Sequence, residues 1–159
     1  MSPAMLSLLR TSLDDCGLGN VTVIESGFFS YPYEPNSMDF VYSRLALHHL
    51  PDFWKSLALQ RIYEMLRSGG VFRLWDVVYN FERHEATERL ENWCATGRHV
   101  APFTPLDDGW GRWEIAEHVR DEHSTYSWLL EAMFERTGLS IEHADKPDAT
   151  TAKYVLRKR

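Results

Sequence analysis

Apolar residues gather in two short runs near the middle of the chain, and an amphipathic segment lies between them. The first run spans residues 39–43 (DFVYS) and the second spans residues 71–78 (VFRLWDVV). Residues 52–67 repeat apolar side chains at helical spacing and are followed by Gly69-Gly70. This order predicts a strand, a crossover helix and a parallel strand, which is the building unit of an open α/β sheet.

The ends of these two predicted strands mark a candidate site. Open α/β sheets bind ligands beyond the C-terminal ends of their strands. Residues 43–49 begin at the last residue of the first run, and Asp76 lies near the end of the second. We therefore expect these residues to line a crevice, with Asp76 binding substrate or, alternatively, capping a turn.

The N-terminal part predicts one helix and one strand ahead of this unit. Ser2-Pro3 is typical of a helix start and Gly17 of a helix end, with apolar residues at helical spacing between them. Residues 21–26 (VTVIES) predict a short strand, because β-branched residues dominate them. Residues 27–37 predict a loop rich in aromatic residues and proline.

The C-terminal part predicts helices, a long loop and a terminal hairpin. The loop, residues 98–113, is rich in glycine and proline and is long enough to form a lid. We expect residues 80–123 to form a helical or lid insertion. The remaining elements, in chain order, are a charged helix at 80–97, a short helix at 114–120, a helix with Ser124 as its N-cap that ends before Gly138, and strands at 139–144 and 152–158. The short spacing of the last two strands predicts an antiparallel hairpin.

Composition and charge fit one ordinary globular domain over residues 1–159. The chain has 159 residues, of which 44% are hydrophobic and 25% charged, enough to bury a core. The net charge is −6, and basic residues are dispersed apart from the final RKR. Nucleic acid is therefore not an expected partner.

The sequence pattern shows neither the apolar segments that direct a chain to a membrane nor the cysteine pattern of a disulfide-rich protein. We expect no signal peptide and no membrane span, because no apolar run is long enough. The two cysteines, Cys16 and Cys94, do not suggest a disulfide framework. We therefore expect a cytoplasmic protein.

The run DFVYSRLALHHLPDFWKSLALQRIYEMLRSGGVFRLWDVVY resembles class I S-adenosylmethionine-dependent methyltransferases, of the small-molecule, methyltransferase type 11-like kind. In that family the LHHLPD segment follows strand four, and an L-x-x-G-G turn precedes strand five. The run from HVRDEHST to AKYVLRK is similar to one subgroup. The resemblance implies a Rossmann-like α/β fold with an open, mostly parallel sheet and an antiparallel last strand. It also implies S-adenosylmethionine as cofactor and methyl transfer to a small-molecule substrate.

The resemblance also shows where this sequence departs from the family. It maps strands three to seven only onto the chain, so we expect a sheet that is incomplete on its N-terminal side. The glycine-rich turn and the ribose-binding carboxylate of the family have no counterpart here. Gly27 stands where the family often has an aspartate that binds adenine. We therefore expect impaired methyl transfer or, alternatively, a non-catalytic remnant that acts as an interaction module or needs a partner chain.

The implied strand order leaves one edge of family strand four without its usual neighbours. Unpaired backbone groups on a strand edge are costly and attract other strands. We therefore expect a rearranged small sheet, a strand supplied by a partner chain or poor folding in isolation. A homodimer formed through this edge is one assembly that would supply such a strand.

The resemblance assigns roles to individual residues. The catalytic candidates are His48 and His49, one of which would act as a weak base or orient the substrate; packing or capping is the alternative. The candidates for cofactor binding are Ser26, Gly27, Phe28, Ser43, Arg44 and Leu45. The candidates for substrate binding are Asp76, His118 and Trp110.

The segment HVRDEHST (118–125) does not have the spacing of a metalloprotease-type metal motif, so we expect no metal there. Instead, we expect either an ion pair between Arg120 and Glu122 or a His118 side chain that faces the pocket. Trp110 belongs to an aromatic group around the expected lid. That group would either close over an apolar substrate or pack as a satellite core.

Overall fold

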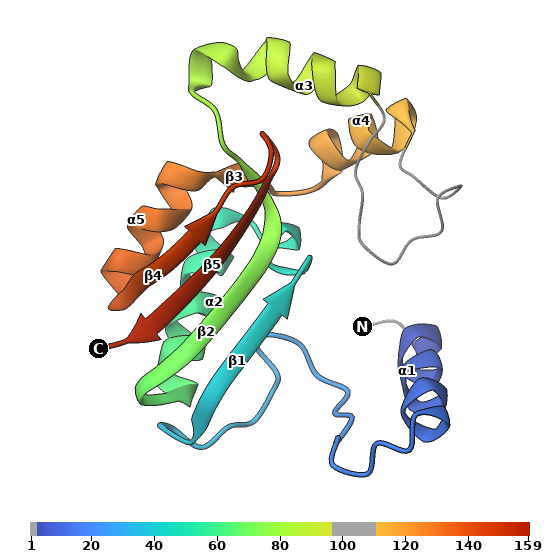
Figure 1. The fold of residues 1–159 in the computed structure, drawn as a ribbon, viewed down its shortest axis with the longest axis vertical. Coiled ribbons are helices and arrows are strands. Elements are labelled where there is room, and N and C mark those ends of the chain that lie inside the picture. The colour runs from blue at the N-terminus through green and yellow to red at the C-terminus, as the bar shows by residue number, and fades with distance from the viewer. Residues whose placement is uncertain (1–2, 97–110) are drawn as a thin grey trace. The chain divides into compact units, whose positions relative to one another are not determined.

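The computed structural model describes residues 3–96 and 111–159. The chain divides into two compact units, Met1–Glu34 and Pro35–Arg159. Figure 1 labels the helices and strands of both units. The expected lid loop, with the exception of residues 111–113, lies outside the described residues, as does Ser2.

The first unit contains one helix, α1 (Pro3–Asp15), as the sequence predicts. Gly17 ends it with a positive φ of 64°, and Leu18 N–H donates to Leu13 O at 3.0 Å. The strand expected at residues 21–26 is wrong: these residues adopt no strand. The physical reason is that a strand needs a hydrogen-bonded neighbour, and here Ser26 N–H donates locally to Ile24 O.

The second unit is built on one sheet in the order β1-β2-β5-β4. Its strands are β1 (Met38–Arg44), β2 (Leu66–Tyr79), β4 (Leu139–Asp145) and β5 (Thr151–Lys158), and a two-residue strand, β3 (Thr125–Tyr126), pairs with the end of β2. Under the expected mapping, this order matches strands four, five, seven and six of the family. The sheet therefore has the architecture that the resemblance implies for the C-terminal half of the fold.

The strand–helix–strand unit in the middle of the chain is confirmed. β1 and β2 pair in parallel, with Val41 opposite Phe72 and Ser43 opposite Leu74. Helix α2 (Asp52–Met65) makes the crossover. In the first part of β2, a Cβ atom on Gly70 would lie 2.9 Å from the backbone oxygen of Arg67, so only glycine fits this close approach.

The expected antiparallel hairpin at the C-terminus is also confirmed. β4 pairs with β5, and β5 pairs with the full middle of β2, from Val71 opposite Arg157 to Val77 opposite Thr151. The helix before the hairpin, α5 (Ser127–Thr137), ends at Gly138 with a positive φ of 91°. Ser124 is not its N-cap: β3 intervenes, and Tyr126 holds the cap position without a side-chain hydrogen bond.

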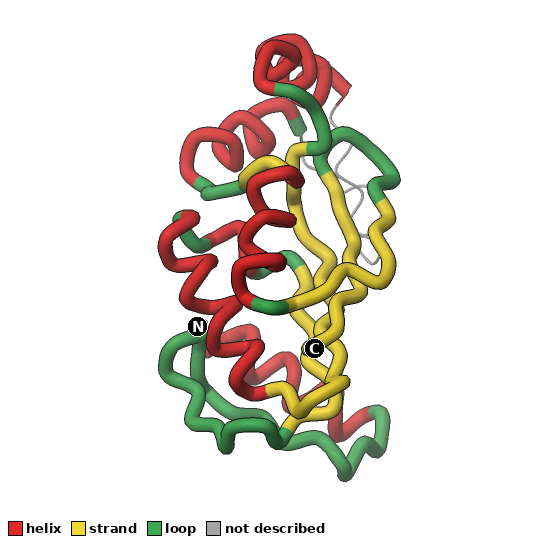
Figure 2. The backbone as a smooth tube through the Cα atoms, turned by 90° about the vertical axis from the view of Figure 1, so that its left-hand side faces the viewer, coloured by secondary structure: helices red, strands yellow, loops and turns green. Residues whose placement is uncertain are grey.

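Helices α2 and α5 cover one face of the sheet, so that helices and strands form separate layers in Figure 2. The core between these helices and the sheet is mostly apolar and inaccessible to solvent. Its members include Leu59, Phe72, Phe134, Tyr154 and Leu156. On β1, Phe40 and Tyr42 are 53% and 47% exposed. Within residues 3–96 and 111–159, no strand pairs with the outer edge of β1.

A smaller helical layer extends from the C-terminal end of β2 (Figure 1). It consists of a short 3₁₀ helix, η2 (Arg83–Glu85), followed by α3 (Ala86–Thr96) and α4 (Arg112–Asp121). Val77, Trp93 and Ile115 form the buried cluster that joins this layer to the sheet. No helix in the described part of the chain is long and apolar enough to cross a membrane.

Candidate functional site

The C-terminal ends of β1 and β2 meet at one corner of the sheet. Arg44 lies opposite Trp75, and Leu45 N–H donates to Trp75 O at 2.8 Å. The chain then turns through Leu45, whose φ is +48°, into the 3₁₀ helix η1 (Leu47–His49). This turn places η1 directly over Asp76 on β2.

Asp76 is the hub of this corner. Its side chain is only 2% exposed. It accepts hydrogen bonds from the backbone N–H groups of Leu47 at 2.8 Å and His48 at 3.3 Å, and from Val77 N–H at 2.8 Å. It also binds Nδ1 of His48. A buried carboxylate needs such partners, because its desolvation is otherwise costly.

His48 is the buried histidine of the expected pair, at 5% exposure. Because Asp76 binds Nδ1, the proton of the neutral ring is placed on that nitrogen, and Nε2 remains as the basic atom. The ring of His49 lies 4.2 Å from that of His48, and the ring of His118 lies 5.2 Å away. The burial of His48 also fits the alternative of a packed histidine, so its catalytic role stays a prediction.

His49 has a different environment, although it is the next residue. Its side chain is 56% exposed, and Nδ1 lies 2.6 Å from Oε2 of Glu122. Glu122 is therefore paired with a histidine, and the expected Arg120–Glu122 pair is wrong. Arg120 instead pairs with its neighbour Asp121 at 2.6 Å, because that carboxylate is already within reach on the same turn.

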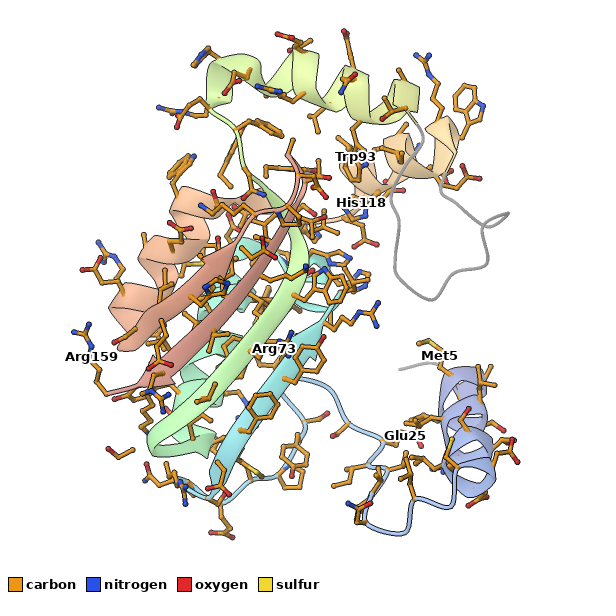
Figure 3. The ribbon with its side chains drawn as sticks, viewed as in Figure 1. Met5, Glu25, Arg73, Trp93, His118 and Arg159 are labelled. Atoms are coloured by element: carbon orange, nitrogen blue, oxygen red, sulfur yellow. The ribbon has the colours of Figure 1, made fainter. Side chains whose placement is uncertain are left out.

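His118 comes from α4 and lies near the same corner. It is 4% exposed, and its ring packs edge-on against Trp93, with centroids 5.6 Å apart. Nε2 lies 3.0 Å from Oγ of Ser124. Figure 3 shows His118 and Trp93 together at the end of the sheet from which α3 and α4 extend.

A buried lysine, Lys55, connects His123 to this corner. Sequence reasoning did not anticipate this contact. Lys55 is 2% exposed and donates from Nζ to Asp52 Oδ1 at 2.8 Å and to the backbone oxygen of His123. His123 N–H in turn donates to His48 O at 2.9 Å. The register between η1 and the segment after α4 is therefore fixed by backbone and charge-assisted hydrogen bonds.

Tyr79 is a second residue that sequence reasoning missed. Burial raises its pKa to about 12, while a hydrogen bond with Ser124 lowers the pKa and the nearby Tyr126 raises it. Ser124 also binds His118, so one hydroxyl links the end of β2 to α4. An isolated Ser-Thr-Tyr triplet gives no sequence signal for such a link.

The candidates for cofactor binding fall into two groups. Ser43 is buried at the end of β1, and its Oγ has no hydrogen-bond partner among the described residues. The guanidinium of Arg44 lies 4.5 Å from the ring centroid of Trp75, and Leu45 packs against the Val77–Trp93–Ile115 cluster. These residues and Asp76 share one corner.

The other candidates are described apart from this corner. Ser26, Gly27 and Phe28 lie in the first unit, where Gly27 N–H donates to Ser30 Oγ at 2.8 Å. Trp110 lies outside the described residues. The proposed roles of these four residues stay predictions.

The corner can do two kinds of chemistry. A histidine whose Nδ1 is held by a carboxylate is a positioned base of the kind used in proton transfer. In addition, one ligand atom each from His48, His118 and Glu122 lie within 4.8 Å of one another, close enough for a metal ion. His48 lies 70 residues before His118 in the sequence, so no local sequence motif could reveal this set of possible metal ligands.

Comparisons with known proteins point in one direction. Residues 1–74 match the family described as a methyltransferase domain. An uncharacterized methyltransferase of Anoxybacillus flavithermus is 34% identical over 125 residues, which cover 78% of this chain and 51% of that protein. An uncharacterized methyltransferase of Geobacillus kaustophilus is 23% identical over 128 residues, which cover 80% of this chain and 53% of that protein.

The fold is similar to solved structures as well. The crystal structure of a putative sarcosine dimethylglycine methyltransferase from Galdieria sulphuraria matches 99% of this chain and 67% of that chain, with a TM-score of 0.70 and 16% identity. At this identity the similarity concerns the fold alone. The chain spans about half the length of the curated relatives that it matches.

Proposed function

We propose that the chain is a member of the class I S-adenosylmethionine-dependent methyltransferase family and that it takes part in methyl transfer from S-adenosylmethionine to a small-molecule acceptor. The observation that carries the proposal is the corner where β1 and β2 end side by side. There, residues 43–49 and Asp76 lie together, at the position where open α/β sheets bind their ligands.

The residues at the end of β1 fit a bound cofactor in one respect. Ser43 Oγ is a buried hydroxyl with no hydrogen-bond partner among the described residues, and buried polar atoms normally have one. We assign Ser43, Arg44 and Leu45 to the methionine part of the cofactor, largely through their backbone. Ser26, Gly27 and Phe28 are proposed contacts of the adenine, where Gly27 supplies no acidic side chain.

The bound cofactor supplies an electrophilic methyl group, so the protein mainly has to hold the acceptor in line with it. In this proposal Asp76 orients His48, and Nε2 of His48 accepts a proton from the acceptor. His49, exposed and paired with Glu122, is assigned to orienting the acceptor at the rim. His118 completes the wall on the α4 side, and Trp110 remains a proposed contact of the substrate.

One departure from the family limits the expected affinity. Residues 1–159 contain no Gly-x-Gly-x-Gly turn, which elsewhere lets backbone approach the cofactor. We therefore propose that this chain alone binds S-adenosylmethionine weakly and that its methyl transfer is impaired. Cytoplasmic localisation remains part of the proposal.

A second candidate function is a non-catalytic interaction module. It is favoured by the outer edge of β1, where Phe40 and Tyr42 are about half exposed and no described strand is paired. Such an edge can accept a strand from another chain, including a second copy. Light scattering over a range of concentrations tests the homodimer: a mass that stays at one chain contradicts it.

Calorimetric titration with S-adenosylhomocysteine separates the two functions. Saturable binding with one ligand per chain supports the methyltransferase proposal. No heat at millimolar ligand, from protein whose circular dichroism shows a folded α/β domain, contradicts it and supports the interaction module.

A further inference from the structure

Three titratable side chains from distant parts of the sequence converge beside the His48–Asp76 pair, and we propose that they bind one divalent transition-metal ion of the zinc class. The residues are His48 in η1, His118 in α4 and Glu122 directly after α4. One ligand atom of each lies within 4.8 Å of those of the other two. The proposal depends on this geometry and is independent of the proposed methyl transfer.

The donor set has the right chemistry for such an ion. Two imidazole nitrogens and one carboxylate oxygen are a ligand combination found at zinc sites that keep a fourth position open. Hard cations such as calcium and magnesium prefer sites made of oxygen atoms alone. Since two of the three ligands here are nitrogen atoms, the set selects against those ions.

The partner of His48 is the strongest indication of a built site. Histidines that bind metals usually donate their other ring nitrogen to a carboxylate or carbonyl, which fixes the ring and its tautomer. Asp76 binds Nδ1 of His48 in this way and is itself held by three backbone N–H groups. Nε2 is thereby left as the nitrogen that can bind an ion.

The other two ligands are supported in a similar manner. Glu122 Oε2 lies 2.6 Å from Nδ1 of His49, which orients the carboxylate and leaves its second oxygen for the ion. His118 lies 3.0 Å through Nε2 from Ser124 Oγ and packs against Trp93. Both rings of the histidine ligands are nearly inaccessible to solvent, at 5% and 4% exposure.

The backbone brings the three ligands into register before any ion is bound. His123 N–H donates to His48 O at 2.9 Å, and Lys55 binds the carbonyl of His123, so the residue after Glu122 is fastened to η1. Ligand atoms around a tetrahedral zinc ion are roughly 3.4 Å apart for metal–ligand distances of about 2.1 Å. The three ligand atoms lie within 4.8 Å of one another, so they have to approach one another only slightly to bind an ion.

An ion at this position would compete with a proton for Nε2 of His48. The metal-bound protein would therefore lack the base proposed above, while its fourth coordination position could take water or a lone-pair atom of an acceptor. The two states exclude each other on one molecule. Metal binding can be measured without cofactor or acceptor, so failure of one proposal does not imply failure of the other.

The test is titration of chelator-treated protein with zinc by calorimetry and with cobalt(II) by visible absorption. We expect one ion per chain, with the intense absorption of four-coordinate cobalt. Glu122→Gln and His118→Gln should each weaken binding roughly tenfold or more, because each removes a ligand. His143→Gln, which changes an exposed histidine on β4, is the matched control and should bind as the wild type does.

Glu122 is only partly buried, so its glutamine variant is the safeguard if His118→Gln fails to fold. Circular dichroism identifies that case. The proposal is overturned if the wild type shows no saturable binding, or if Glu122→Gln retains wild-type zinc affinity and the same cobalt spectrum.

Discussion

Asp76, at the end of β2, binds both the ring nitrogen Nδ1 and the backbone N–H of His48, which follows the end of β1. One carboxylate therefore connects the two parallel strands beyond the point where their ladder ends. It also fixes which nitrogen of His48 faces the rest of the corner. The stability of the corner and its chemistry depend on the same side chain.

Asp76→Asn should destabilise the protein substantially. The amide keeps the volume but replaces a charged acceptor of four hydrogen bonds with one that can accept through its oxygen only. We expect a loss of about 2–4 kcal/mol in the free energy of unfolding, measured by urea denaturation. Asp39→Asn, which breaks an exposed pair with Arg67, is the control and should change stability by less than about 1 kcal/mol. Equal effects would contradict the role of Asp76.

His48 should be found as the tautomer that is protonated at Nδ1. The cause is the contact with Asp76, which fixes the proton on that nitrogen. Nitrogen-15 NMR of the ring at neutral pH distinguishes the two tautomers directly. His49→Gln should leave the His48 signals in this form, whereas Asp76→Asn should shift them toward a mixture. A wild-type ring protonated only at Nε2 would contradict the geometry.

Lys158 should stabilise the end of the sheet that lies opposite the candidate site. Its ammonium is buried and donates to Tyr63 O at 2.8 Å, Leu66 O at 2.7 Å and Asn36 Oδ1 at 2.9 Å. Lys158→Met keeps the apolar stem but leaves these acceptors unpaired, so we expect a loss of about 2–3 kcal/mol by urea denaturation. Lys153→Met removes a more exposed pair with Asp145 at 3.2 Å and should cost less than about 1 kcal/mol. Similar losses in both variants would show that the carbonyl contacts of Lys158 contribute little.

Tyr79 should make stability fall at alkaline pH. Burial raises its pKa from 10.0 to about 12, so the unfolded chain loses this proton first as the pH rises. The contribution is fully present below pH 10, declines between about pH 10 and 12, and amounts to roughly 2–3 kcal/mol at its limit. The measurement is the difference in unfolding free energy between wild type and Tyr79→Phe at several pH values. A difference that stays constant from pH 9 upward, within about 0.5 kcal/mol, would contradict the shift.

The central unit of the fold could be predicted because its signals are local. Apolar runs at 39–43 and 71–78 with a helical period between them allow few arrangements, and parallel pairing follows from the crossover. The terminal hairpin was predictable for the same reason. The strand expected at 21–26 failed because β-branched residues indicate a strand only when a neighbouring strand is available to pair with.

The sequence predicted where the candidate site lies in the fold, but not which of its side chains contact one another. The rule that ligands bind beyond strand ends identified His48, His49 and Asp76 together. The sequence could not reveal that Glu122 pairs with His49 rather than Arg120, because that choice depends on where α4 returns to the sheet. The buried positions of Lys55 and Lys158 were likewise invisible, since lysine is normally an exposed residue.

The most direct test of the account is an amide chemical-shift map of the isotope-labelled protein titrated with S-adenosylhomocysteine. The account predicts that the largest shifts fall on residues 43–49 and on Asp76 and Val77, at the corner where β1 and β2 end. Saturable shifts centred elsewhere, such as on α5 and β4 at the far side of the sheet, would contradict it.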